Sequence, residues 1–310
     1  MRLRRDEPIE VKTPAQLAKM REAGLVTESA LRAAVSAVEP GISTAELDAI
    51  AEREIRAAGA VPSFKGYHGF PATICASVND QIVHGIPSPD QVLRHGDVIS
   101  IDCGAIVGGW HGDSAVTVRV VGPEADGQAG PATGTDRTRQ DEQAGLLDAC
   151  ELALWHGLAQ AAPGSRLTDI SHAVEQAARA AGRYGIVREY TGHGIGTRMH
   201  MDPPVPNFGR AGRGPVLMEG MALAIEPMLT LGSPRTRLLD DGWTVVTADG
   251  SLAAHFEHTV AITADGPWVL TAADGGAAGL AAVRAGRLRP RPDQLAAADG
   301  SARGGAEHGL

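Results

Sequence analysis

The sequence lacks the features that mark several large classes of protein. Its 310 residues include only three cysteines and no CxxC pair, so neither a disulfide scaffold nor a thiolate zinc site is expected, and a reducing compartment is favoured. No apolar run is long enough to cross a bilayer, and the first residues carry charges without the apolar core of a signal peptide. We therefore expect a cytoplasmic protein that does not bind membranes.

An excess of basic residues is also missing. The formal net charge is -9, whereas proteins that bind nucleic acid carry basic patches that neutralise phosphates. We therefore expect no direct reading of nucleic acid. The acidic charge and the lack of an exposed apolar stripe favour a monomer.

The residues that are present predict a mixed α and β protein. Helical periodicity and capping signals predict helices at residues 14–40, 43–58, 143–161 and 169–181. Short β-branched runs predict strands at residues 72–78, 98–102, 115–121, 221–225, 243–246 and 254–262, with a hairpin turn at 108–112. Residues 123–140, rich in glycine, proline and threonine, are predicted to be a flexible insertion, and the chain beyond Thr271 a disordered tail.

One stretch of sequence recurs at a constant offset. Pro40-Gly41 and the helix that ends at Gly59 match Pro163-Gly164 and the helix that ends at Gly182, 123 residues later in each case (40 to 163, 59 to 182). Both copies lead into strands, which suggests two related αβ halves in one domain. The alternative is that alanine-rich helices ending in glycine look alike through composition alone.

Four acidic residues stand in or beside apolar strands. They are Asp102 and Glu226, which end predicted strands, Asp113, which follows the hairpin turn, and Glu257, which lies inside a predicted strand. A buried carboxylate costs free energy unless it is paired or bound to a metal. Any one of these residues could cap a turn, but four in one chain require a common explanation.

A histidine supplies a ligand of a different kind. His193 lies between two glycines, which let the backbone approach its neighbours closely and present the ring into a cavity. A Gly-His-Gly loop can be purely structural when considered alone. Together with the four carboxylates it forms a mixed oxygen and nitrogen set that suits two divalent ions, such as Co, Mn, Fe or Zn. The five residues therefore indicate a two-metal hydrolase.

The chain resembles the type I methionine aminopeptidases, which have the pita-bread metallopeptidase fold. The phrases that carry the resemblance are KTPAQLAKMREAG (12–24), PSFKGYHGFPATICASVNDQIVHGIP (62–87), DVISIDCGAIVGGWHGDSAVT (97–117), YTGHGIG (190–196), ALAIEPM (222–228) and HFEHTVAIT (255–263). The resemblance implies an α+β fold with two pseudo-symmetric αβ halves, a central curved antiparallel sheet and outer helices. It covers residues 9–271, which we expect to form a single catalytic domain.

The resemblance also implies roles for individual residues. It assigns the same five residues, Asp102, Asp113, His193, Glu226 and Glu257, as ligands of two divalent metal ions. It makes Glu226 the general base and places His84 and His200 beside the scissile peptide as catalytic and substrate-binding residues. Without the resemblance, either histidine would more readily be interpreted as a structural residue. The chain departs from the family around His200, where His-Met-Asp-Pro replaces the usual His-Glu-x-Pro.

Further residues match positions in or beside a methionine side-chain pocket. They are Tyr67, His68, Phe70, Cys75 and Trp243. A soft apolar pocket suits a thioether side chain, although Phe70 and Trp243 are equally compatible with ordinary core packing. The implied function is removal of N-terminal methionine from peptides and nascent proteins with a small second residue, in a setting where contact with the ribosome is plausible.

Three other functions stay open at this point. An unrelated metal-storing or structural protein would leave the family-like phrases around His84 and His200 unexplained. An X-Pro dipeptidase or an aminopeptidase P of the same fold would cleave bonds to proline, but such enzymes usually carry a further N-terminal domain. An inactive binding module of this fold would have lost metal ligands, and all five are present here.

Overall fold

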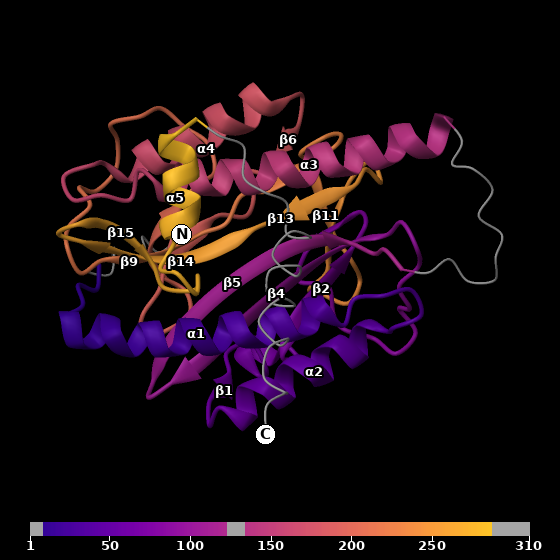
Figure 1. Ribbon diagram of the computed structural model, residues 1–310, viewed down its shortest axis with the longest axis horizontal. Helices are drawn as coiled ribbons and strands as arrows, with labels where there is room; N and C mark the ends of the chain where they lie inside the picture. The colour runs from indigo at the N-terminus through magenta and orange to yellow at the C-terminus, as the bar shows by residue number, and fades with distance from the viewer. Residues whose placement is uncertain (1–8, 123–133, 287–310) are drawn as a thin grey trace, which may run out of the picture.

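The computed structural model describes residues 9–122 and 134–286 (Figure 1). The helices are α1 (Pro14–Ser36), α2 (Thr44–Ala57), the 3-10 turn η1 (Tyr67–Gly69), α3 (Gly134–Leu158), α4 (Leu167–Ala181) and α5 (Ala277–Arg284). The strands of the main sheet are β1 (Val61–Pro62), β2 (Ile74–Val78), β4 (Val98–Val107), β5 (Trp110–Arg119), β7 (Gly192–Gly194), β8 (Met201–Val205), β9 (Ala222–Ile225), β14 (Glu257–Thr263) and β15 (Gly266–Val269). The smaller sheets contain β3 (Gln81–Val83), β6 (Gly185–Ile186), β10 (Met228–Thr230), β11 (Thr236–Leu238), β12 (Val245–Thr247) and β13 (Ala253–His255).

The first two helices begin where their capping signals predict. The Thr13 hydroxyl accepts a hydrogen bond from the Gln16 amide, and the Gln16 side chain accepts one from the Thr13 amide, which completes a capping box. Ser43 and Glu46 form the same motif at the start of α2. These reciprocal bonds satisfy amides that have no partner inside the helix.

The main sheet is antiparallel, with the strand order β1-β4-β5-β14-β9-β7-β8. Its central hairpin joins β4 and β5 through Gly108 and Gly109, both at positive φ. Successive side chains along each strand point to opposite faces of the sheet. In β4, Ile99 and Ile101 pack into a core with α1 and α2, while Asp102 points to the opposite face. This topology confirms the predicted α+β class.

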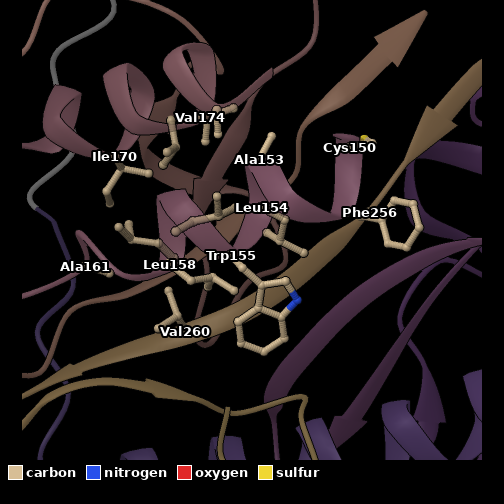
Figure 2. Close-up of a cluster of buried hydrophobic side chains, with 14 of the residues drawn as sticks. Cys150, Ala153, Leu154, Trp155, Leu158, Ala161, Ile170, Val174, Phe256 and Val260 are labelled. Atoms are coloured by element: carbon tan, nitrogen blue, oxygen red, sulfur yellow. The ribbon is translucent and has the colours of Figure 1, made fainter. Parts of the chain in front are cut away.

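A second core lies between the sheet and the later helices. Figure 2 shows Leu154, Trp155 and Leu158 of α3 packed with Ile170 and Val174 of α4 above β14. Burial of such side chains contributes about 25 cal/mol for each Å² of apolar surface removed from water. Within the described ranges, no helix is both long and apolar enough to span a membrane.

The sequence repeat corresponds to a repeated structure. Arg56 pairs with Glu52 at 2.7 Å on α2, and Arg179 pairs with Glu175 at 2.6 Å on α4. The loop before each helix is also held alike: the Gly41 amide donates to the Leu93 carbonyl, and the Gly164 amide to the Leu217 carbonyl. Helix α2 shares a core with the paired strands β4 and β5, and α4 shares one with the paired strands β9 and β14, so the two αβ halves meet between β5 and β14.

Three predictions from the sequence need correction. Residues 134–140, predicted to belong to a flexible insertion, form the start of α3, where residues 138–140 are exposed and the sequence has no apolar periodicity; residues 123–133 lie outside the described residues. The predicted disordered tail contains α5, because Leu280 is buried and Gly279 lets the helix lie against Trp155. The predicted strand 254–262 is interrupted at Phe256, where β13 turns to pair with β10.

Candidate metal centre

The five predicted ligands come from five consecutive strands of the main sheet. They are Asp102 on β4, Asp113 on β5, Glu257 on β14, Glu226 at the end of β9, and His193 on β7. All five line one cavity of about 120 Å³. The strand register explains this convergence: Asp102 and Glu257 both stand opposite Ala115, one from each side, so their side chains share a face.

Backbone crowding explains the glycines around His193. A Cβ atom at Gly192 would overlap the carbonyl oxygen of Ala224, and one at Gly194 would overlap that of Asp202. Only glycine lets β7 fit between β8 and β9 at this point. The His193 Nδ1 donates to the Gly194 carbonyl at 2.9 Å, which leaves the Nε2 lone pair facing the carboxylates.

The donor atoms lie close enough to share cations. One ligand atom each from Asp113, His193 and Glu257 lie within 4.8 Å of one another, and the His193 Nε2 is 3.5 Å from the Glu226 Oε1. Three carboxylate oxygens of the centre are buried without a hydrogen-bond donor among the described residues: the Oδ1 atoms of Asp102 and Asp113 and the Oε1 of Glu257. Such oxygens are costly to bury alone. The set therefore fits hard or borderline divalent cations.

The pKa values of the buried acids indicate that the centre is stabilised by positive charge. Burial raises the pKa of Asp102 to about 7 and that of Glu226 to about 8. Burial, reinforced by the neighbouring carboxylates, raises the pKa values of Asp113 and Glu257 well above the ordinary range. Burial lowers the pKa of His193 to about 3, so its ring is neutral and able to act as a ligand. Divalent ions would offset the repulsion among these acids.

The two other predicted histidines lie at the same cavity. The His200 ring is 4.3 Å from the His193 ring, and its Nδ1 is 2.9 Å from the Tyr67 hydroxyl. His84 follows β3 with a φ of 60°, a strained value for a residue with a side chain. Burial lowers its pKa to about 4. Strain held at a cavity wall is typical of functional positions.

Most of the residues predicted to form the substrate pocket lie together around the cavity. Tyr67, Phe70, Cys75 and Trp243 line the cavity, and the Phe70 and Trp243 rings meet edge to face at 5.1 Å. His68 is not among the lining residues; it is exposed and packs against Tyr67 at 4.3 Å. Two apolar lining residues, Phe64 and Met199, were missed. Neither carries a sequence signal beyond apolar character, because tertiary packing alone selects them.

His255 is a further residue beside the centre that was not predicted from the sequence. Its side chain is 2% exposed, and its Nε2 lies 3.6 Å from the Glu226 Oε2. A signal was available, since residues two apart on a strand share a face and His255 precedes Glu257 by two positions.

Comparison with known proteins identifies the family of this chain. Residues 18–264 match the model of metallopeptidase family M24. The chain belongs to metallopeptidase family M24. A curated M24 relative, methionine aminopeptidase 1 of Mycobacterium tuberculosis, is 52% identical over 271 residues, covering 86% of this chain and 96% of that protein.

Solved structures place the chain within the M24 fold. The crystal structure of methionine aminopeptidase from Thermotoga maritima superposes with a TM-score of 0.77 at 38% identity, covering 85% of this chain and 99% of that one. The prolidase from Pyrococcus furiosus has a TM-score of 0.61 at 22% identity, covering 84% of this chain and 65% of that one, and so shares the fold alone. The predicted pita-bread fold is thereby confirmed.

Proposed function

We propose that this protein is a methionyl aminopeptidase, a metallo-exopeptidase that removes N-terminal methionine from peptides and nascent proteins with a small second residue. The observation that carries the proposal is the convergence of four acids and one histidine beside a soft apolar cavity. The M24 relative at 52% identity, matched over 96% of its length, is named for the same activity. The X-Pro enzymes share only the fold, and this chain spans 65% of the prolidase.

The two divalent ions, drawn from Co, Mn, Fe or Zn, would be held by Asp102, Asp113, His193, Glu226 and Glu257. When bound, the ions polarise the scissile carbonyl and make the attacking water more acidic. The centre lies against a wall that excludes solvent, since Asp113, His193 and Glu257 are all less than a tenth exposed. Electrostatic interactions are stronger in such surroundings than in water.

The protein groups provide proton transfer and orientation. Glu226 is the carboxylate suited to accept a proton from the attacking water, because it lines both of the cavities that meet at the centre. With the Tyr67 hydroxyl donating to the His200 Nδ1, the His200 Nε2 keeps its proton and can donate to the carbonyl oxygen. His84, held neutral by burial, can hydrogen-bond the amide of the second residue.

The apolar part of the cavity accounts for selection of methionine. Phe64, Phe70, Cys75, Met199 and Trp243 form one packed apolar cluster with their neighbours. A thioether side chain gains from contact with aromatic rings and from leaving water. The Cys75 thiol serves as a contact here, because burial and the nearby carboxylates raise its pKa and suppress the reactive thiolate.

Peptide hydrolysis tests the proposal directly. The protein is treated with a chelator, reloaded separately with Co²⁺, Mn²⁺, Fe²⁺ or Zn²⁺, and assayed on Met-Ala-Ser, Met-Lys-Ser and Ala-Pro. We expect release of methionine from Met-Ala-Ser alone, and only after reloading. Cleavage confined to Ala-Pro would refute the proposal in favour of an X-Pro peptidase.

Replacement of the proposed base provides a second test. Glu226→Gln keeps the size of the side chain. Glutamine cannot accept the proton and binds cations more weakly than glutamate, so kcat should fall by about 10²- to 10⁴-fold. Circular dichroism would show that the variant is folded. Activity within a factor of two of the parent would exclude Glu226 as the base.

The proposal extends to the setting of the reaction. Nascent chains emerge from ribosomes, so the expected location is the cytoplasm and the expected partner is the translating ribosome. Cosedimentation of the protein with ribosomes would test this part separately from catalysis.

A further inference from the structure

A second histidine lies beside the acidic centre, near the carboxylate oxygen of Glu226 that His193 does not approach. His255 ends β13, and its Nε2 lies 3.6 Å from the Glu226 Oε2 and 4.0 Å from the Glu257 Oε2. Among the described residues, one donor atom each from Glu226, His255 and Glu257 form a cluster within 4.8 Å. This cluster shares Glu257 with the Asp113, His193 and Glu257 group.

The Nε2 atom of His255 has no hydrogen-bond partner among the described residues, although it is buried. A buried ring nitrogen without a partner is unfavourable, so a bound species is expected there. Both separations from the carboxylate oxygens are too long for hydrogen bonds. They are close to the 3.5 Å between the His193 Nε2 and the Glu226 Oε1, two atoms proposed to bind cations.

These separations suit ligands around a common ion. Nitrogen and oxygen ligands lie about 2.0–2.2 Å from a metal such as zinc, so two ligand atoms of one ion lie between about 3 Å apart at a right angle and about 4.4 Å apart across the ion. The ring is also held in place by its backbone. The His255 amide donates to the Thr117 hydroxyl at 2.8 Å, and the same hydroxyl donates to the His255 carbonyl at 2.8 Å.

We propose that His255 is a nitrogen ligand of the cation held by Glu226 and Glu257, so that the centre contains one imidazole for each of its two ions. The inference rests on the proposed metallo-aminopeptidase and adds a sixth ligand to it. Among the described residues, no lysine or arginine lines either of the two cavities that meet at Glu226. The imidazole thus adds a neutral donor to a centre whose other ligands are mostly anionic.

Proton NMR of the Co²⁺-loaded protein tests ligation directly. A histidine bound to Co²⁺ through Nε2 shows its ring N–H as a strongly shifted, exchangeable signal. We expect two such signals from the parent protein and one from His255→Gln, because glutamine can still hydrogen-bond Glu226 but is a poor ligand. One signal in the parent protein would overturn the proposal, and this result does not depend on any variant folding.

Calorimetric titration with Co²⁺ gives an independent readout. In His255→Gln we expect one of the two binding steps to weaken at least about tenfold. His95→Gln, which removes an exposed histidine away from both cavities, is the control and should bind as the parent does. Two unweakened steps in His255→Gln would refute the role of His255 while leaving the aminopeptidase intact. A parent protein that binds no cation would contradict both proposals.

Discussion

At the level of single residues, the buried acids make the metal-free protein sensitive to pH. Burial raises the pKa of Asp102 to about 7 and that of Glu226 to about 8, so the folded chain retains protons that the unfolded chain releases. The free energy of unfolding therefore falls as the pH rises towards 8. The histidines have the opposite effect on the free energy of unfolding, because burial lowers the pKa of His193 to about 3 and that of His84 to about 4.

The histidine contribution rises with pH only up to the ordinary value of 6.5, so above it the carboxylates dominate. We expect urea denaturation of the chelator-treated protein to give a lower free energy of unfolding at pH 8 than at pH 6.5. Added Mn²⁺ should reverse the loss, since cations bind the deprotonated acids and release their protons. A metal-free protein that becomes more stable over this interval would contradict the assignment.

The sequence predicts ligands better than it predicts cavity walls, for a physical reason. An acid in an apolar strand, such as Asp102 or Glu257, is costly unless something binds it, so its position alone is informative. Phe64 and Met199 are apolar residues whose role depends on which cavity they face. His68 matched a pocket position by resemblance, yet it is an exposed residue with a positive φ, and its exposure could not be deduced from its neighbours in sequence.

At the level of elements, one side chain joins the first helix to the end of β15 and the turn that follows it. The Arg21 guanidinium on α1 donates to the carbonyls of Val269, Leu270, Ala272 and Ala273 at 2.6–3.2 Å. Hydrogen bonds from a charged donor contribute about 1.5–3 kcal/mol. We therefore expect Arg21→Met, which keeps the apolar stem, to lower the free energy of unfolding by about that amount in urea denaturation.

The matched control lies on the same helix. The Arg32 side chain is 63% exposed and forms a surface ion pair with Glu28 at 3.4 Å. Surface pairs of this kind contribute less than about 1 kcal/mol, so Arg32→Met should be nearly neutral. Equal losses from the two substitutions would show that the carbonyl contacts of Arg21 do not stabilise the fold.

The elements differ in how well the sequence specifies them. The capping boxes at Thr13 and Ser43 predict where α1 and α2 begin, because each box involves residues only three positions apart. Helix α5 is only eight residues long and rich in alanine and glycine, and its order depends on contact with the distant Trp155. The break at Phe256 is equally non-local, since β13 leaves the main sheet to pair with β10.

At the level of the whole molecule, the centre lies on the seam between two similar halves. The seam is narrow: β5 and β14 share two paired positions, whereas β4 and β5 pair along their full length. Two threonines cross it in the same way. The Thr259 hydroxyl accepts from the Asp113 amide at 3.0 Å and donates to the Asp113 carbonyl at 2.9 Å, and the Thr117 hydroxyl holds His255 likewise. Each threonine thus fixes a residue of the centre to the other half.

This arrangement predicts that the seam couples stability to cation binding. Thr259→Val keeps the shape of the side chain but leaves the buried Asp113 amide without its partner, which should cost about 1–3 kcal/mol in the free energy of unfolding. Because Asp113 is then less well held, the affinity for Co²⁺ measured by calorimetry should fall about 10- to 100-fold. Thr73→Val is the matched control, since Thr73 is fully buried and its hydroxyl makes no hydrogen bond among the described residues. It should change neither quantity. A Thr259→Val protein that loses stability but binds Co²⁺ as tightly as the parent would show that the two halves hold the ions independently of this contact.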